Sequence, residues 1–197
     1  VIGKNKALIS VFAGSRKSEI NVLMPILLEF IILMNKKYSD MTFVFHSTKE
    51  YSQFIQSFLD KSNLKNCEIV SDDKIKAHIL QKSIFAVAKS GTVSLEICNA
   101  KIPSMILYKM GFINFLIIKT LVKTKYANII NFTADKEIIP ELLQSNCNAE
   151  NIFKYVSSFM DDSNKIDEQL KKVKIILDKL KINGSSSELA SLSLNKF

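Results

Sequence analysis

The sequence predicts an α/β domain whose core is a Rossmann-like parallel sheet with helices on both faces. Short apolar runs of strand length alternate with longer runs whose apolar residues recur at helical spacing. A strand followed by a helix returns to the sheet parallel to its predecessor, so the alternation predicts parallel strands that are covered on both sides. Glycine-containing turns follow two of the apolar runs, at the edge where such sheets bind ligands.

Each expected element rests on its own apolar pattern. The expected strands are residues 7–12, 41–45, 68–70, 84–87 and 104–107. The expected helices are residues 22–34, 51–59, 75–80, 92–100, 112–122, 138–144, 152–159 and 166–182. Pro25 lies inside the first helical pattern, so that helix either begins there or continues through a kink.

The pattern predicts one domain over residues 1–182, in which the helices after the last strand form a helical C-terminal extension. Asn183, Gly184 and three serines predict a flexible break before a short terminal segment, together residues 183–197. The chain begins with Val1 and has no signal-peptide pattern, so we expect a piece of a longer chain or a processed product.

The composition is that of a globular protein and argues against several classes. The 27 basic and 19 acidic residues give a net charge of +8. Apart from Arg16 the basic residues are scattered lysines, so we expect no nucleic-acid partner. A modest attraction to anionic phosphates or lipid headgroups remains compatible with this charge. No apolar run extends without interruption over the roughly 20 residues that a transmembrane helix needs. Cys67, Cys98 and Cys147 lie far apart, so we expect reduced thiols of a cytoplasmic protein and no metal site.

Two turns carry the candidate ligand-binding residues. Gly14 and Gly91 each lie between an expected strand and an expected helix, with Ser15, Ser90 and Thr92 beside them. Such turns present backbone N–H groups to an anion, and the positive end of the following helix adds to the attraction. We therefore predict a phosphate-binding edge, while noting that ordinary tight turns use the same residues.

Two charged residues follow these turns. Arg16 is the single arginine, and its planar guanidinium suits a phosphate or carboxylate; the alternative is a structural salt bridge. Glu96 lies about one helical turn beyond the second glycine, where a carboxylate can accept hydrogen bonds from sugar hydroxyls. A favourable charge near the helix N-terminus explains Glu96 equally well. His46 and His78 have no partner at metal or triad spacing, so we expect structural or surface histidines.

Four segments resemble the lipid-A-disaccharide synthase family in identity and spacing. They are residues 14–20 (GSRKSEI), 88–96 (AKSGTVSLE), 121–126 (LVKTKY) and 136–144 (KEIIPELLQ). A serine-glycine-threonine turn with a later glutamate is shared more widely among two-domain glycosyltransferases, whereas the last two segments make this family the specific choice. The resemblance covers nearly the whole chain and the second half of the family's length.

The resemblance implies the C-terminal domain of a glycosyltransferase-B fold, which binds the UDP of the donor UDP-diacylglucosamine. The implied acceptor is diacylglucosamine 1-phosphate (lipid X), whose primary hydroxyl attacks the anomeric carbon with inversion. No metal or other cofactor is implied; Arg16 would stabilise the leaving diphosphate, and Asn131 and Glu137 would join the donor site. The general base is expected in the N-terminal half of the family. The resemblance further implies a bacterial protein peripheral to the inner membrane, and it leaves homo-oligomerisation open.

Two other functions remain open. One is a different UDP-N-acetylglucosamine-using enzyme of the same fold, such as an undecaprenyl-linked glucosaminyltransferase or a UDP-sugar epimerase. The other is a non-catalytic binding module or a remnant of the enzyme. Residues 110–125 combine apolar side chains with lysines, a pattern that fits either an interfacial helix at an anionic membrane or a helix packed on the sheet.

Overall fold

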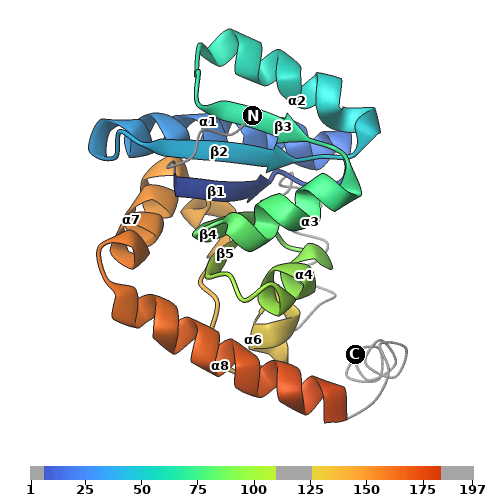
Figure 1. The fold of residues 1–197 in the computed structure, drawn as a ribbon, viewed down its shortest axis with the longest axis vertical. Helices are drawn as coiled ribbons and strands as arrows, with labels where there is room; N and C mark the ends of the chain where they lie inside the picture. The colour runs from blue at the N-terminus through green and yellow to red at the C-terminus, as the bar shows by residue number, and fades with distance from the viewer. Residues whose placement is uncertain (1–6, 110–125, 183–197) are drawn as a thin grey trace.

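The computed structural model describes residues 7–109 and 126–182, and the strands in that part of the chain form one six-stranded sheet. The strands are β1 (Ala7–Phe12), β2 (Met41–His46), β3 (Cys67–Val70), β4 (Phe85–Lys89), β5 (Ser104–Tyr108) and β6 (Glu141–Leu143). They are all parallel, in the order β3-β2-β1-β4-β5-β6. The arrowheads of β1, β2 and β3 in Figure 1 point to the same side of the sheet, towards the ligand edge.

Helices cover both faces of this sheet, which confirms the predicted fold class. The helices are α1 (Lys17–Lys37), α2 (Lys49–Ser62), α3 (Asp73–Lys82), α4 (Val93–Asn99), α6 (Ile129–Ala134), α7 (Ala149–Met160) and α8 (Ser163–Ile182), with a 3-10 turn η1 (Gln144–Asn146). The apolar faces of α1, α2 and α7 share one core cluster with the sheet, and those of α3, α4, α6 and α8 share another. The C-terminal helices α7 and α8 therefore each complete one side of the domain (Figure 1).

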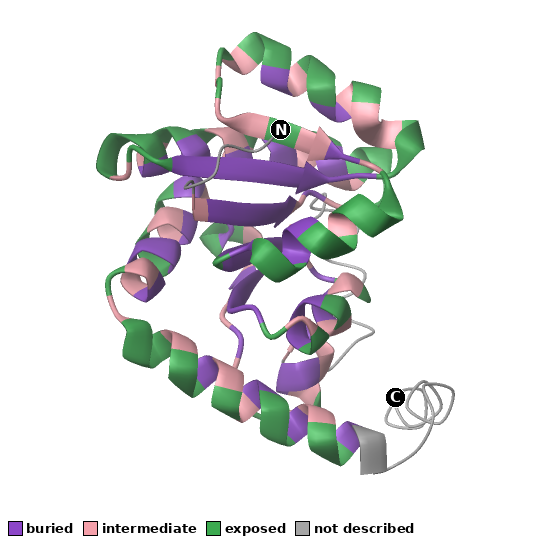
Figure 2. Cartoon of the chain, viewed as in Figure 1, coloured by how far each residue is buried: buried purple, intermediate pink, exposed green. Residues whose placement is uncertain are grey.

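Strand β4 shows how the sequence serves both faces. Phe85 and Val87 belong to the cluster under α1 and α7, whereas Ala86 and Ala88 belong to the cluster under α4 and α8. Side chains alternate along a strand, so bulky residues fill one side and alanines allow a close approach on the other. Full burial of a side chain such as Phe85 contributes about 1.5–3 kcal/mol. The inner strands β1, β2, β4 and β5 are accordingly buried along most of their length, whereas the edge strands β3 and β6 are mostly of intermediate burial. Figure 2 shows the buried inner strands and the exposed outer faces of the helices.

Helix α1 begins at Lys17, eight residues before Pro25, and passes through the proline. Of the two alternatives left by the sequence, continuation is thus the observed one. Pro25 and Asn21 both lie on the exposed face, so the Asn21 carbonyl that loses its helical donor faces solvent. By length and composition alone α1 could cross a membrane, but its buried stripe from Ile20 to Met34 packs against the sheet.

The predicted helix over residues 138–144 is wrong. Residues Glu141–Leu143 instead form β6, which extends the sheet beyond β5. The open edge of β5 decides this, because its backbone groups need partners: Ile106 N–H donates to the carbonyl of Pro140 at 2.8 Å. The sequence also gave no indication of α6 at Ile129–Ala134, whose six residues are too few for a clear helical period. The predicted helix 112–122 and the predicted break at 183–197 lie outside the described residues.

Candidate functional site

The strand order places a crevice between the loops that follow β1 and β4. These strands are neighbours, yet β1 leads into α1 on one face of the sheet and β4 leads into α4 on the other. The two connections diverge, and a crevice of this kind is where open α/β sheets bind ligands. A cleft of about 920 Å³ opens at this point, within the size range of small-molecule sites.

Most of the predicted site residues meet in this cleft. Those that line it are Gly14, Ser15, Arg16, Ser90, Gly91, Thr92 and Glu96. The loop after β2 contributes Ser47 and Thr48, and one face of α3 forms a side wall. Of the loops that follow the expected strands 7–12, 84–87 and 104–107, the first two are present in the cleft. Most of the third belongs to residues 110–125, which are not described.

The first turn depends on its glycine. Gly14 has a φ of +119°, and a Cβ at this position would come within 2.7 Å of the Cβ and Oε2 of Glu19. The missing side chain allows the Glu19 carboxylate to fold back over the turn, where Oε2 accepts the N–H of Ser15 at 3.1 Å. Arg16 occupies the N-cap position of α1 with its side chain exposed to the cleft. A cation and the first N–H groups of a long helix thus face the same space.

A charged pair that the sequence did not single out joins the two turns. The Nζ of Lys89, the last residue of β4, lies 2.7 Å from Oε1 of Glu19, and both residues line the cleft. Burial alone would raise the pKa of Glu19. The hydrogen bonds from Lys89 and the Ser15 N–H, together with the charges of Lys89 and Arg16, outweigh burial and hold that pKa below its usual value. Glu19 therefore remains an anion inside a site expected to bind anions.

Two hydrogen bonds of Ser90 hold the second turn in place. The Ser90 hydroxyl donates to the carbonyl of Ala127 at 2.6 Å, and its backbone N–H donates to the carbonyl of Leu107 at 2.8 Å. The hydroxyl hydrogen of Ser90 is thus engaged within the protein. Gly91 and Thr92 are exposed, and a Cβ on Gly91 would meet no atom within 4 Å. The open side of the second turn is therefore its Gly91–Thr92 edge.

Asn131 and Glu137, which the family resemblance added to the site, do not line the cleft. Asn131 is fully buried: its amide nitrogen donates to Ile139 O and Glu141 Oε1, and its amide oxygen accepts from the N–H groups of Ile138 and Ile139. The Glu137 carboxylate is exposed and accepts the N–H of Glu141 at 3.2 Å. In the described structure both side chains hold the loop before β6.

Glu141 is the centre of that loop's polar network. Its carboxylate accepts hydrogen bonds from the N–H groups of Ala127 and Asn128 and from the Asn131 amide, at 2.7–2.9 Å. Burial raises the pKa of Glu141, although the three donors oppose that effect. Because Ala127 also accepts from Ser90, the network supports the second turn of the cleft from behind. Glu141 lies within segment 136–144 of the family resemblance, but the sequence alone predicted no role for it.

Glu96 lies on α4, one turn beyond Thr92, and its exposed side chain faces the cleft, as predicted. Across the cleft, α3 presents Lys76, which is 3.0 Å from Asp73 on the same helix. Glu96 thus stands beside the second turn without a positive partner among the described ion pairs. A carboxylate in this position can accept hydrogen bonds from ligand hydroxyls.

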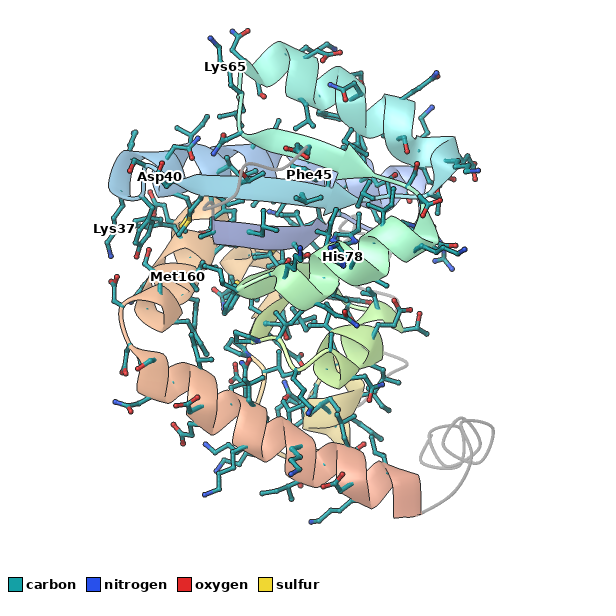
Figure 3. All side chains as sticks on the ribbon, viewed as in Figure 1. Lys37, Asp40, Phe45, Lys65, His78 and Met160 are labelled. Carbon is teal, nitrogen blue, oxygen red and sulfur yellow. The ribbon has the colours of Figure 1, made fainter. Side chains whose placement is uncertain are left out.

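His46 is structural, as expected, but it also forms part of the cleft wall. Its Nε2 lies 2.8 Å from Ser10 Oγ, which lies 2.7 Å from Ser83 Oγ, and Ser83 donates to the carbonyl of Ile79. Each hydroxyl has one hydrogen, so Ser10 donates to Ser83 and His46 Nε2–H donates to Ser10. Burial, and to a smaller extent the charge of Lys76, lowers the pKa of His46 to about 4. His78 is exposed on α3 (Figure 3).

The cysteines are free thiols, and none of the three lines the cleft. Cys98 and Cys147 are buried and Cys67 is partly exposed; burial raises the pKa of Cys67 and of Cys98 to about 12. Within residues 7–109 and 126–182, no group of three or more His, Cys, Asp or Glu side chains is placed to hold a metal ion.

A family model described as lipid-A-disaccharide synthetase matches residues 1–194. The chain belongs to this family. It is 36% identical over 187 residues to a lipid-A-disaccharide synthase of Rickettsia prowazekii, covering 94% of this chain and 48% of that protein. It is 32% identical over 202 residues to the lipid-A-disaccharide synthase of a Sulfurihydrogenibium species, covering 97% and 51%. The chain spans about half the length of these curated relatives.

Solved structures of low sequence identity share the fold of this family member. The C-terminal domain of a glycosyl transferase group 1 family protein from Francisella tularensis matches with a TM-score of 0.57 at 14% identity, covering 88% of this chain and 85% of that chain. A UDP-GlcNAc 2-epimerase from Neisseria meningitidis, solved with UDP-GlcNAc bound, matches with a TM-score of 0.62 at 16% identity, covering 92% and 46%. The fold is that of the C-terminal domain of glycosyltransferase-B proteins.

Proposed function

We propose that this chain is the donor-nucleotide-binding part of a lipid-A-disaccharide synthase, an inverting glycosyltransferase. The donor in this proposal is UDP-diacylglucosamine and the acceptor is lipid X, diacylglucosamine 1-phosphate. One observation carries the proposal: in a chain of this family, the Gly14 turn, Arg16 and the Gly91–Thr92 edge converge on one cleft at the crevice of the sheet. The convergence supports a ligand that combines a diphosphate with a sugar.

The two turns divide the donor between them. We assign the diphosphate to the Ser15 N–H, the Arg16 guanidinium and the open Gly91–Thr92 edge, because these groups supply donors and positive charge. Glu96 is assigned to the ribose hydroxyls, which need an acceptor on the same side of the cleft as the second turn. Asn131 and Glu137 then act on the site indirectly, through the loop that supports Ser90.

The reaction exchanges one C–O bond for another at the anomeric carbon. The primary hydroxyl of lipid X forms the new bond from the face opposite the diphosphate. The bond to the β-phosphate oxygen breaks, and its electron pair leaves with UDP. Arg16 stabilises the negative charge that grows on that oxygen, because its guanidinium brings positive charge and a planar set of donors to the cleft. The hydroxyl proton passes to a base that we place in the N-terminal half of the family, since Glu19 and Glu96 have other tasks here.

Both proposed substrates carry acyl chains, so the enzyme would work at the surface of the inner membrane, on its cytoplasmic side. The sequence pattern of residues 110–125, apolar side chains beside lysines, supports this location. We expect weak association with anionic vesicles that fades as salt is added, because salt screens the lysines. Equal binding to neutral and anionic vesicles would contradict the electrostatic part of this proposal.

Two measurements test the proposal. Calorimetric titration of the 197-residue chain should show weak UDP binding, and the same chain incubated with UDP-diacylglucosamine and lipid X should form no disaccharide. A complete enzyme, with the family's N-terminal half joined to this chain, should form it. Absence of UDP binding would contradict the donor site. Disaccharide formation by the chain alone would contradict the placement of the general base in the N-terminal half. If the complete enzyme turned over UDP-N-acetylglucosamine without lipid X, another enzyme of the same fold would be the better assignment.

A further inference from the structure

The ion pair between Lys89 and Glu19 lies inside the cleft and is shielded from solvent. The Lys89 side chain is 21% exposed and that of Glu19 is 14% exposed. The partners of the other ion pairs within the described residues are more exposed, up to 94% for Asp73. A shielded ion pair is weak grounds for stability, because removing both charges from water offsets their attraction. We therefore consider what this ion pair, placed in the cleft, does when a ligand binds.

Glu19 engages two donors that face the cleft. One carboxylate oxygen accepts the Lys89 ammonium at 2.7 Å and the other accepts the Ser15 N–H at 3.1 Å. The Ser15 N–H follows directly on the Gly14 turn, which is built for the close approach of an acceptor. In the free protein, the Glu19 carboxylate thus occupies the position of an anionic ligand.

The charged side chains that line the cleft balance, with three cations (Arg16, Lys76 and Lys89) against three anions (Glu19, Asp73 and Glu96). Only the part around the first turn favours an anion, and only slightly. On α3, Lys76 pairs with Asp73 at 3.0 Å. The first turn and the end of β4 then carry two cations, Arg16 and Lys89, against the single anion Glu19. Any ligand phosphate near the Ser15 N–H meets the Glu19 carboxylate as well as the two cations.

We propose that Lys89 is a diphosphate-binding cation that Glu19 holds in reserve, and that Glu19 competes with the ligand for Lys89 and the Ser15 N–H. When a diphosphate enters, the ammonium group turns towards it. A lysine suits this exchange, because its ammonium carries three donors on a flexible stem and can turn from Glu19 to a phosphate oxygen. This inference rests on the proposed function, in which the ligand is a nucleoside diphosphate sugar.

The competition makes affinity depend on the charge of the ligand. Uridine brings no phosphate and cannot draw Lys89 away from Glu19, whereas UDP can. Lys89→Gln should therefore lower the affinity for UDP by about tenfold or more, the scale of one hydrogen bond to a charged group, and leave the affinity for uridine within about twofold. Glu19→Gln keeps an acceptor for the Ser15 N–H but removes the competing charge, so it should raise UDP affinity by about three- to tenfold.

The experiment is calorimetric titration of UDP and of uridine into the 197-residue chain and its variants, each checked for folding by circular dichroism. Lys172→Gln is the matched control, because it breaks an exposed Lys–Glu pair on α8 that does not line the cleft; both affinities should match those of the unaltered chain. Lys89→Arg, which keeps a cation, should restore most of the UDP affinity. If Lys89→Gln does not fold, the double variant Glu19→Gln with Lys89→Gln removes both charges together. It should bind UDP more weakly than Glu19→Gln alone.

The outcomes separate this inference from the proposed function. No UDP binding by the unaltered chain overturns the donor site and this inference with it. UDP binding that is the same in Lys89→Gln as in the unaltered chain overturns the inference and leaves the donor site intact. An equal loss of UDP and uridine affinity shows that the pair only shapes the cleft, and a lower UDP affinity in folded Glu19→Gln shows that Glu19 does not compete. Either result overturns the inference.

Discussion

The Nζ of Lys89 lies 2.7 Å from Oε1 of Glu19, and the other oxygen of that carboxylate accepts the N–H of Ser15. This pair of contacts connects the end of β4 with the first turn of α1, across the crevice of the sheet. Gly14 makes the connection possible, because any side chain there would collide with Glu19. The relative position of the two ligand-facing turns is thus set by side-chain chemistry as well as by strand pairing.

The second turn has a corresponding support on its other side. Ser90, adjacent to Lys89, donates to the carbonyl of Ala127. The N–H groups of Ala127 and Asn128 in turn donate to the Glu141 carboxylate. A partly buried carboxylate with three N–H donors makes a rigid anchor, since leaving any of these groups unpaired would be costly. Segment 136–144 of the family pattern therefore reaches the cleft through Ser90 and not by direct contact.

The two glycines of the turns should respond differently to a methyl group. Gly14→Ala places a side chain at φ +119° and against Glu19, so it should lower the free energy of unfolding by about 1–3 kcal/mol from backbone strain alone. Gly91→Ala meets no atom, so stability should change by less than about 0.5 kcal/mol. Urea unfolding of both variants checks this, and each is the control for the other.

Although Gly91→Ala should leave stability almost unchanged, it should weaken ligand binding. The added methyl group would occupy the open edge that we assign to the diphosphate, so folded Gly91→Ala should bind UDP more weakly than the unaltered chain. UDP titration of the alanine variant measures this directly. Unchanged affinity would remove the Gly91–Thr92 edge from the proposed site.

The fold was predictable because the strands and helices of the first half carry strong apolar periods. Residues 7–12 form a strand with the predicted bounds, and the turns at Gly14 and Gly91 lie at the predicted edge. Residues 138–144 were mispredicted because the apolar spacing of about two turns of helix also fits an edge strand. The need of β5 for hydrogen-bond partners, a tertiary effect, decided between them.

The site was predictable where backbone geometry selects the residue, as at Gly14, and where residue type is distinctive, as with Arg16. Lys89 and Glu19 were not predicted as a pair, because the sequence does not distinguish this lysine from the many others. Their importance depends on the contact that the fold brings about between β4 and α1. The contacts of Asn131 were not predictable for a similar reason. An asparagine in a family segment can contact a ligand or a loop, and only the burial of all its polar groups shows that it holds a loop here.

Arg16→Lys keeps the positive charge of the first turn but loses the planar fork. In a complete enzyme, turnover should fall by roughly 10²–10³, the scale for one lost electrostatic donor at a developing charge. Steady-state rates with both substrates measure the effect. Lys17→Gln is the control, since Lys17 is the neighbouring exposed cation but does not line the cleft. Wild-type turnover by folded Arg16→Lys would refute the diphosphate assignment.

Glu96→Gln keeps the shape of the side chain and weakens it as an acceptor. Binding of UDP should weaken by about 1.5–3 kcal/mol if Glu96 accepts charge-assisted hydrogen bonds from the ribose. Glu150→Gln is a matched control, because Glu150 is an exposed glutamate in the first turn of α7 and lies outside the cleft. Equal UDP affinity in both variants would mean that Glu96 is only a helix-terminal charge.

His46 should make stability depend on pH below neutrality. Its pKa is lowered to about 4 in the folded chain from 6.5, so the unfolded chain binds more protons between these values. Stability must then fall as the pH is lowered through that window. A shift of this size corresponds to a loss of about 2 kcal/mol between pH 7 and pH 5. Urea unfolding at the two pH values gives the difference directly.

His46→Gln isolates this contribution, because a glutamine amide can still donate to Ser10 but does not titrate. The loss of stability between pH 7 and pH 5 should therefore be about 2 kcal/mol smaller in this variant than in the unaltered chain. His78→Gln is the control, because it replaces an exposed histidine on α3 that lies outside the hydrogen-bond chain of Ser10 and Ser83. If His46→Gln loses as much stability on acidification as the unaltered chain, then His46 is not buried as a neutral donor to Ser10. The hydrogen-bond chain from His46 to Ile79 would then have to be reassigned.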